Sequence, residues 1–346
     1  MVQDGGADLG NAIYQFSEHM TGSMQLITSS SYGSPIYRCL QSFNEKLWMG
    51  TTSGYLCYLD GTTWVVVASG FPAISSMVIY NNSLYFSCTD GTLRKLNTDN
   101  TVITVATKYG SEYPLALAIL NNKIYASTEG TGCLLEWNGI DAWILRAAQL
   151  NSQHSAYSLT AYNGKLYVGT GDSSLLFEWN GVDAWIQVGG LNKTWYLEAL
   201  MVFNGKLYAG YTTDFSTGGH LYEWNGVDTL TLVAAGGGYS TFNEIEDFII
   251  YNNELYAGTG KNGYLVKWNG SNAWIIVSTG LGGYLDGLCV HNGILYAMAT
   301  NGTLYANGKA EFIRIRNLKH IADGQNTNSR GIKFKKADES WDGVNI

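Results

Sequence analysis

The sequence predicts an all-β fold made of repeated four-stranded antiparallel sheets, and three observations lead to that prediction. One phrase occurs seven times: an apolar strand, a two-residue turn that begins with Asn, and a second strand that opens on Leu-Tyr or a close variant. The turn asparagines recur at intervals of 37 to 48 residues, and no helical pattern lies between them. They are Asn44, Asn81, Asn121, Asn163, Asn204, Asn252 and Asn292. A period of about forty residues built only of strands predicts a seven-bladed β-propeller, with eight blades as the alternative.

The fourth repeat shows how one blade is built. Residues 158–170 contain two apolar strands joined by Asn163-Gly164, and a type I′ turn requires a positive φ at both of these positions. Residues 175–188 contain two further strands around a second Asn-Gly pair. Where another repeat lacks the turn Gly, Asn usually replaces it, since Asn tolerates a positive φ. Glu45 is the exception, and we expect a strained or different turn there.

Two other positions repeat with the blades. Tryptophans flank an Asn-Gly pair on the outer strands, and a Trp that recurs in this way is more commonly core than a sugar-stacking platform. We therefore expect these rings to cover the seams between neighbouring blades. Five residues before each turn Asn stands a mostly small residue, which we expect to pack at the crowded centre of the ring. This set is Cys39, Ser76, Ala116, Ser158, Ala199, Asp247 and Gly287.

The ends of the chain suggest how the ring closes. Residues 13–16 and 24–28 resemble the two outer strands of a blade, so residues 1–35 are predicted to donate outer strands to the last blade or to a partial eighth one. Residues 36–316 are predicted to form the propeller. Residues 317–346 are predicted to form a short basic β extension.

Composition excludes several functional classes. The net charge of −8 argues against nucleic-acid binding and against binding to anionic membranes, and no apolar run is long enough for membrane insertion. The five cysteines are scattered and form no metal-ligand or disulfide pattern. No secretory signal is visible, so we expect a virion or extracellular protein that lacks a signal peptide of the usual kind, or otherwise a cytoplasmic one.

The C-terminal region differs from the rest in charge. From Lys309 onward there are eight basic residues against five acidic ones, so the preceding body is the strongly acidic part. Such a segment is commonly a solvated surface. The alternative is a docking segment for an acidic partner or for another copy of the chain, which would make the protein a homo-oligomer.

The repeated Asn-Gly-Lys-Leu-Tyr phrase, followed by Gly169, Gly210 or Gly258, resembles the repeats of kelch and galactose-oxidase-like propellers. The resemblance covers residues 36–316 and implies the propeller fold. Kelch repeats carry a double glycine where this chain has Gly169-Thr170, and the copper ligands of galactose oxidase have no counterpart here. The low charge and the Asn, Gly and Trp content are similar in style to propellers of bacteriophage tail and host-recognition proteins and of lectins.

Unusual residues gather near the start of the first strands in the fifth to seventh repeats. Glu198, Glu246 and Asp286 stand at the same repeat position, six residues before the turn Asn, so equivalent strands should place them side by side on one face. Arg38 and Tyr157 hold this position in the first and fourth repeats. The candidate ligand-binding set also includes Trp195, Tyr196, Glu244, Asp247 and Tyr284.

Clustered carboxylates beside aromatic rings can bind a sugar, hold a hard cation such as Ca²⁺, or perform acid–base chemistry on a glycosidic bond. They can equally be solvated charges that pair with Arg38 or Lys193. No His has a matched Ser, Cys or Asp partner, and we assign no catalytic or metal residue.

We therefore predict a non-enzymatic recognition or structural module, a bacteriophage tail-associated virion protein that binds a glycan or a virion or surface protein at one propeller face. No cofactor is expected, with Ca²⁺ left open. The alternatives are a carbohydrate-active enzyme, either a glycosidase or a lyase, that uses the Glu198, Glu246 and Asp286 carboxylates, and a secreted lectin.

Overall fold

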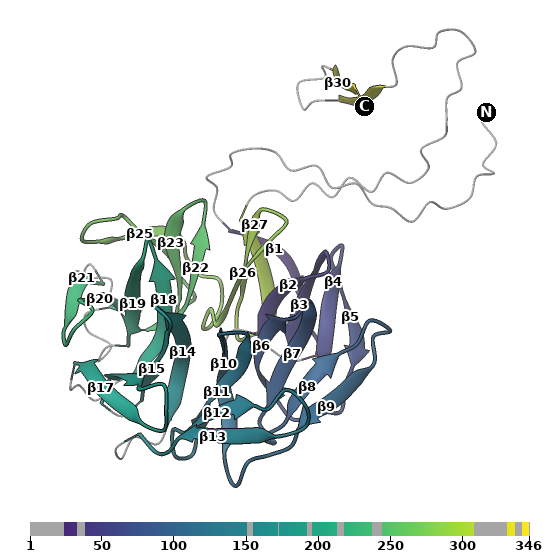
Figure 1. Cartoon of the computed structure of the whole chain (residues 1–346). Helices are drawn as coiled ribbons and strands as arrows, with labels where there is room; N and C mark the ends of the chain where they lie inside the picture. Colours follow the sequence, from purple (N-terminus) through teal and green to yellow (C-terminus); the bar gives the residue numbers. More distant parts are fainter. Residues whose placement is uncertain are drawn as a thin grey trace. The chain divides into compact units, whose positions relative to one another are not determined.

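The computed structural model describes residues 24–32, 39–150, 155–171, 173–191, 196–212, 218–236, 244–307, 331–335 and 341–345. Within the unit Ser17–Ala310, these residues form seven four-stranded antiparallel sheets, and no described residue is helical (Figure 1). The predicted seven-bladed, all-β fold is therefore confirmed. A second unit, Met1–Phe16 with Glu311–Ile346, contains a hairpin of β29 (Gly331–Lys335) and β30 (Trp341–Asn345).

In six of the seven blades, the four strands pair in chain order. The first blade contains β2 (Leu40–Phe43), β3 (Lys46–Gly50), β4 (Leu56–Asp60) and β5 (Thr63–Ala68). The second contains β6 (Ile74–Tyr80), β7 (Ser83–Cys88), β8 (Leu93–Leu96) and β9 (Val102–Ala106). The third contains β10 (Tyr113–Leu120), β11 (Lys123–Glu129), β12 (Leu134–Trp137) and β13 (Trp143–Ala147).

The fourth blade contains β14 (Ala156–Tyr162), β15 (Lys165–Thr170), β16 (Leu175–Trp179) and β17 (Trp185–Gly190). The fifth contains β18 (Leu197–Phe203), β19 (Lys206–Tyr211), β20 (His220–Trp224) and β21 (Leu230–Ala234). The sixth contains β22 (Ile245–Tyr251), β23 (Glu254–Thr259), β24 (Leu265–Trp268) and β25 (Trp274–Ser278). The first strand of each blade contacts the first strands of both neighbouring blades, so these strands form the inner wall of the ring.

The seventh blade joins the two ends of the propeller. It contains β26 (Gly287–His291), β27 (Ile294–Met298), β28 (Thr303–Asn307) and, as its outermost strand, β1 (Met24–Ser29). β1 runs antiparallel to β28, with Met24 opposite Asn307 and Ser29 opposite Thr303. The count is seven blades rather than eight. Residues 13–16, predicted as a further outer strand, lie outside the described residues.

The seven inner hairpins share one turn geometry. The turn Asn has a φ of 45° to 50° in every blade, and the residue after it has a φ of 53° to 76°. Positive φ at both central positions defines the type I′ turn expected from the sequence. Of the two alternatives expected at Glu45, a strained or a different turn, the second was wrong: the turn is the same, and Glu45 adopts at a φ of 57° the left-handed conformation that favours Gly or Asn.

The outer Trp-Asn-Gly phrase forms a second repeated turn. In the third blade, the Asn138 Oδ1 accepts hydrogen bonds from the backbone N–H groups of Ile140, Asp141 and Ala142 at 2.8 to 3.1 Å. Asn180, Asn225 and Asn269 do the same in the next three blades. One side chain therefore satisfies three backbone donors, which explains why this phrase needs Asn.

Aromatic rings fill four of the seams between blades. In each case, the Trp of a third strand lies against the Tyr of a second strand in the preceding blade, with ring centroids 4.9 to 5.4 Å apart. The pairs are Tyr85–Trp137, Tyr125–Trp179, Tyr167–Trp224 and Tyr208–Trp268. These tryptophans are seam packing, as the sequence analysis expected.

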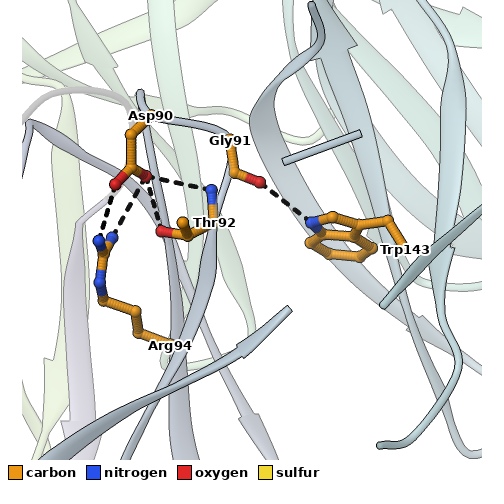
Figure 2. Close-up of polar contacts among 5 residues, drawn as sticks. All are labelled: Asp90, Gly91, Thr92, Arg94 and Trp143. Carbon is orange, nitrogen blue, oxygen red and sulfur yellow. Dashed lines mark hydrogen bonds and ion pairs between the residues drawn. The ribbon is translucent and has the colours of Figure 1, made fainter. Parts of the chain in front are cut away.

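Tryptophans of the fourth strands tie the blades together by hydrogen bonds. The Trp143 indole N–H donates to the Gly91 carbonyl of the second blade at 3.1 Å (Figure 2). The loop that presents this carbonyl is held by Asp90, which accepts from Thr92 and from the Arg94 guanidinium. Trp185 and Trp274 donate in the same way to Gly132 and Gly219, respectively. In the third, fourth and sixth blades, the indole therefore anchors the blade on a loop of the one before it.

The small residues of the inner strands do more than fill space, which corrects the packing-only expectation. The Ser158 Oγ donates to the Leu197 carbonyl at 3.0 Å, and the Cys39 Sγ lies 3.2 Å from the Ile74 carbonyl. The Ser76 Oγ accepts from the Leu117 N–H at 3.1 Å. Each of these bonds joins an inner strand to the backbone of the next blade.

A charged pair connects the second and third strands of several blades. Lys165 pairs with Glu178 in the fourth blade and Lys206 with Glu223 in the fifth. In the sixth blade the two signs are exchanged, since the acid, Glu254, follows the turn and the base is Lys267 on the third strand. All three blades therefore keep an ion pair between the second and third strands, but the strand that carries the acid differs.

Glu178→Lys is expected to lower the free energy of unfolding by about 1–2 kcal/mol, because it loses the Lys165 pair and the Tyr167 hydrogen bond. Adding Lys165→Glu reproduces the sixth-blade order and should recover about 0.5–1 kcal/mol. Urea unfolding of the parent, the two single variants and the double variant measures this coupling. No recovery in the double variant would contradict it.

Trp143→Phe should cost about 1 kcal/mol more in unfolding free energy than Trp64→Phe. Both tryptophans are 5% exposed, but the Trp64 indole N–H has no hydrogen-bond partner among the described residues. Both substitutions therefore replace a buried indole ring, but only Trp143→Phe also removes a hydrogen bond. Equal losses in parallel urea titrations would show that the bond to Gly91 adds no stability.

Candidate functional site

The propeller repeat places three acidic residues at equivalent points of neighbouring inner strands. Glu198 is the second residue of β18, Glu246 is the second residue of β22, and Asp286 directly precedes β26. Because these strands have the same turn and the same register, their starts lie at the same end of the ring. All three residues line one cavity. The structure therefore brings these three carboxylates together, as their common repeat position predicted.

This cavity lies among the inner strands and has a volume of about 200 Å³. Its apolar wall includes the large residues that stand four positions before the turn Asn: Leu40, Met77, Leu117, Leu159, Phe248 and Leu288. Its polar part includes Tyr157 with Glu198, Glu246 and Asp286. Among the described residues, no Lys, Arg or His lines it. The cavity is therefore lined by both aliphatic and acidic side chains.

Glu246 is the most perturbed acid of the cavity. Burial raises its pKa well above the ordinary value, and the negative charges of Glu198, Asp286 and Glu244 raise it further, together with a hydrogen bond with Glu244. Like charges held together at low dielectric favour the neutral acid. The carboxyl group of Glu246 therefore holds its proton to a higher pH than a solvated glutamic acid does.

Tyrosines lie beside the carboxylates. The Tyr157 and Tyr196 rings lie 5.3 Å apart at 58°, and burial raises the Tyr157 pKa, with a further contribution from Tyr196. Tyr284 is 40% exposed, and its pKa is raised first by Glu244, then by burial and by Glu246. Tyr284 therefore lies in the field of the same acidic cluster.

Glu198 is held from the second strand of its own blade. The Thr212 Oγ1 donates to the Glu198 Oε2 at 3.2 Å, and Thr212 directly follows β19. The sequence analysis missed Thr212 and also missed the role of the apolar wall. The wall had a signal, since its residues recur four positions before each turn Asn. Thr212 had none, because its contact depends on how the two strands meet.

Two candidate residues are not placed, and one has another role. Arg38 and Trp195 lie outside the described residues. Asp247 borders the cavity, but its carboxylate accepts from the Leu288 N–H at 3.0 Å and from the Phe248 N–H at 2.9 Å. It therefore joins the sixth blade to the seventh, at the position where other blades have Ser or Cys.

Within the described ranges, no group of three or more His, Cys, Asp or Glu residues is arranged to hold a metal ion. No helix in the described part of the chain is long and apolar enough to cross a membrane. The cavity offers a combination of acidic groups, phenol rings and aliphatic surface. That combination suits a ligand with a cationic or hydroxyl-rich end.

No protein-family model matches the chain, and no curated protein matches it. Solved structures do match. The extracellular domain of the putative hybrid two-component system BT4673 from B. thetaiotaomicron has a TM-score of 0.64 at 13% identity, over 82% of this chain and 39% of that one. This chain therefore spans well under half the length of that protein.

Two further structures match over nearly their full length. The WD40 β-propeller domain of Doa1 has a TM-score of 0.63 at 13% identity, over 84% of this chain and 98% of that one. A chain of the mitotic checkpoint complex has a TM-score of 0.61 at 12% identity, over 89% and 98%. At this level of identity the likeness is one of fold, and it establishes the protein as a β-propeller.

Glu246→Gln is expected to flatten the dependence of stability on pH. In the parent, the raised pKa means that the folded state keeps a proton which the unfolded chain releases near its ordinary pKa of 4.5. This contribution is complete below that value and is lost as pH rises through the folded-state pKa. Urea unfolding at about pH 4 and about pH 8 measures it. Parallel profiles for parent and variant would contradict the assignment.

Proposed function

We propose that this protein is a non-enzymatic recognition propeller that binds a partner protein at the acidic end of its central cavity. The single observation on which this depends is the cavity of about 200 Å³ whose lining combines Glu198, Glu246 and Asp286 with apolar side chains. The group that fits this combination is a Lys or Arg side chain of the partner.

Each part of the cavity would contact a different part of such a side chain. The carboxylates would pair with the charged head, which relieves the repulsion that keeps a proton on Glu246. The phenol ring of Tyr157, which also lines the cavity, offers a cation–π contact. The leucines would cover the aliphatic stem, since long basic side chains bury their methylenes on apolar surface.

A protein partner is also in keeping with the fold. Rigid propellers present loops and cavities at their two faces, and one structure with this fold comes from an assembly, the mitotic checkpoint complex. Fold alone does not assign a function, so the proposal depends on the cavity. The bacteriophage tail role expected from the style of the sequence stays a prediction.

Two other functions would use the same residues. A glycan would stack on the tyrosines and donate its hydroxyl hydrogens to the carboxylates. A glycosidase would use two of the carboxyl groups as acid and base. Both are outcomes that the following experiment separates from a protein partner.

Basic and neutral peptide arrays, a glycan array and a set of polysaccharides are to be tested with the parent protein. Binding to Lys- or Arg-containing peptides should fall about 10-fold or more, or about 1.4 kcal/mol, in Glu198→Gln and Asp286→Asn. Asp60→Asn is the matched control, because it removes one exposed acid that does not line the cavity.

Equal losses in Asp60→Asn would mean that net charge alone attracts the peptides, which overturns the proposal. Sugar binding that disappears in the cavity variants would assign a glycan in place of a protein. Cleavage of a polysaccharide that disappears in Glu246→Gln would assign an enzyme.

A further inference from the structure

The outermost strand of the seventh blade is connected differently from its counterparts. In the other six blades the fourth strand follows the third directly in the chain, and a short connection links the two. β1 instead pairs with β28 across most of the sequence, from Met24 to Asn307. Its link to the next strand in the chain, β2, is the ten residues 30–39. No hairpin turn therefore holds β1 against its blade.

β1 is also less buried than most outer strands. Its first residue, Met24, is its only buried residue. In β13, β17, β21 and β25 the first and fifth residues are both buried. β5 has one buried residue as well, but that residue is Trp64 and the strand is tied to β4 by a two-residue turn.

β1 lacks the indole hydrogen bond that three other outer strands make to the preceding blade. Met24 stands where three other outer strands have a Trp that donates to the preceding blade, and a thioether has no N–H to donate. The contacts that remain at its far end are the Ser30 N–H to the Gly302 carbonyl at 2.7 Å and the Ser29 and Thr303 hydroxyls at 3.5 Å. Low burial and the lack of a hairpin connection distinguish β1 from the other outer strands, and segments with little burial open locally before the rest of a fold.

We propose that the edge of β28 is a strand-binding site that also accepts β1 from a second copy of this chain. The exchanged strand makes the same pairs, Met24 to Asn307 and Ser29 to Thr303, so no contact is lost. In the exchanged pair, the connection from β1 to β2 is still the ten residues 30–39, which as an extended chain reach up to about 33 Å. The partner that this surface fits is therefore the protein itself.

Intramolecular closure competes with exchange. A short tether gives an effective concentration of about 1 mM, so exchanged pairs accumulate only when copies are crowded or held together. A disulfide between the two copies detects exchanged pairs even when they are rare, because each pair that oxidises stays linked and accumulates.

The test uses two full-length variants, Ser29→Cys and Thr303→Cys. Each variant has a different affinity tag, so that a heterodimer can be told from a homodimer. The two hydroxyls are close enough for a disulfide after small shifts, and the five native cysteines are buried. The chains are mixed at high concentration and oxidised. A covalent heterodimer is expected on a non-reducing gel, and reduction should remove it. The matched control mixes Ser29→Cys with Thr63→Cys, whose residue is exposed on another outer strand.

The doubly substituted chain, Ser29→Cys with Thr303→Cys, reports whether β1 is docked at all. When oxidised it should stay monomeric and should no longer exchange with partner chains. The proposal would be overturned by two results together. The heterodimer would be no more abundant than in the control mixture, and the double variant would form its intrachain disulfide completely. A free peptide copying residues 24–30 that binds while no heterodimer forms would overturn the second copy as occupant.

Discussion

The contact between one blade and the next is the constraint on which the structure depends. A four-stranded sheet cannot bury both of its faces alone, so every blade requires its neighbours. In this chain the requirement is met by rings such as Tyr85 and Trp137 and by the indole bond from Trp143 to Gly91. The same seams set the positions of the inner strands and therefore the width of the cavity.

The seams are not equal around the ring. The third to sixth blades each bring a third-strand Trp against the preceding Tyr, whereas Leu59 and Leu96 stand at that position in the first two blades. The ring closes in the less regular part, where β1 replaces a hairpin strand. Closure there depends on apolar contacts around Leu40, Trp64 and Tyr296. The third to sixth blades are thus the regular part of the ring, and the ring is closed in the less regular part by β1.

The acidic cavity follows from this frame. Equivalent strands bring equivalent positions together, so three acids far apart in the sequence become neighbours. Rigid seams prevent them from separating, which is why burial and mutual repulsion raise the pKa of Glu246 instead of being relieved by movement. Asp247 illustrates the other use of an inward carboxylate, because its two backbone donors make it part of a seam.

The sequence alone determined the propeller fold, the hairpins and the grouping of Glu198, Glu246 and Asp286, because these follow from local patterns that recur about every forty residues, and it left the blade count between seven and eight. An Asn-Gly pair predicts a type I′ turn from the sequence alone, because the requirement for a positive φ concerns only these two residues. Tertiary structure alone decided that the N-terminal strand completes the seventh blade and begins no eighth one, and it alone decided the bond from Thr212 to Glu198 and the seam role of Asp247. These features depend on which surfaces meet after the ring has closed, and a local strand pattern at residues 24–28 does not say which strand edge it pairs with.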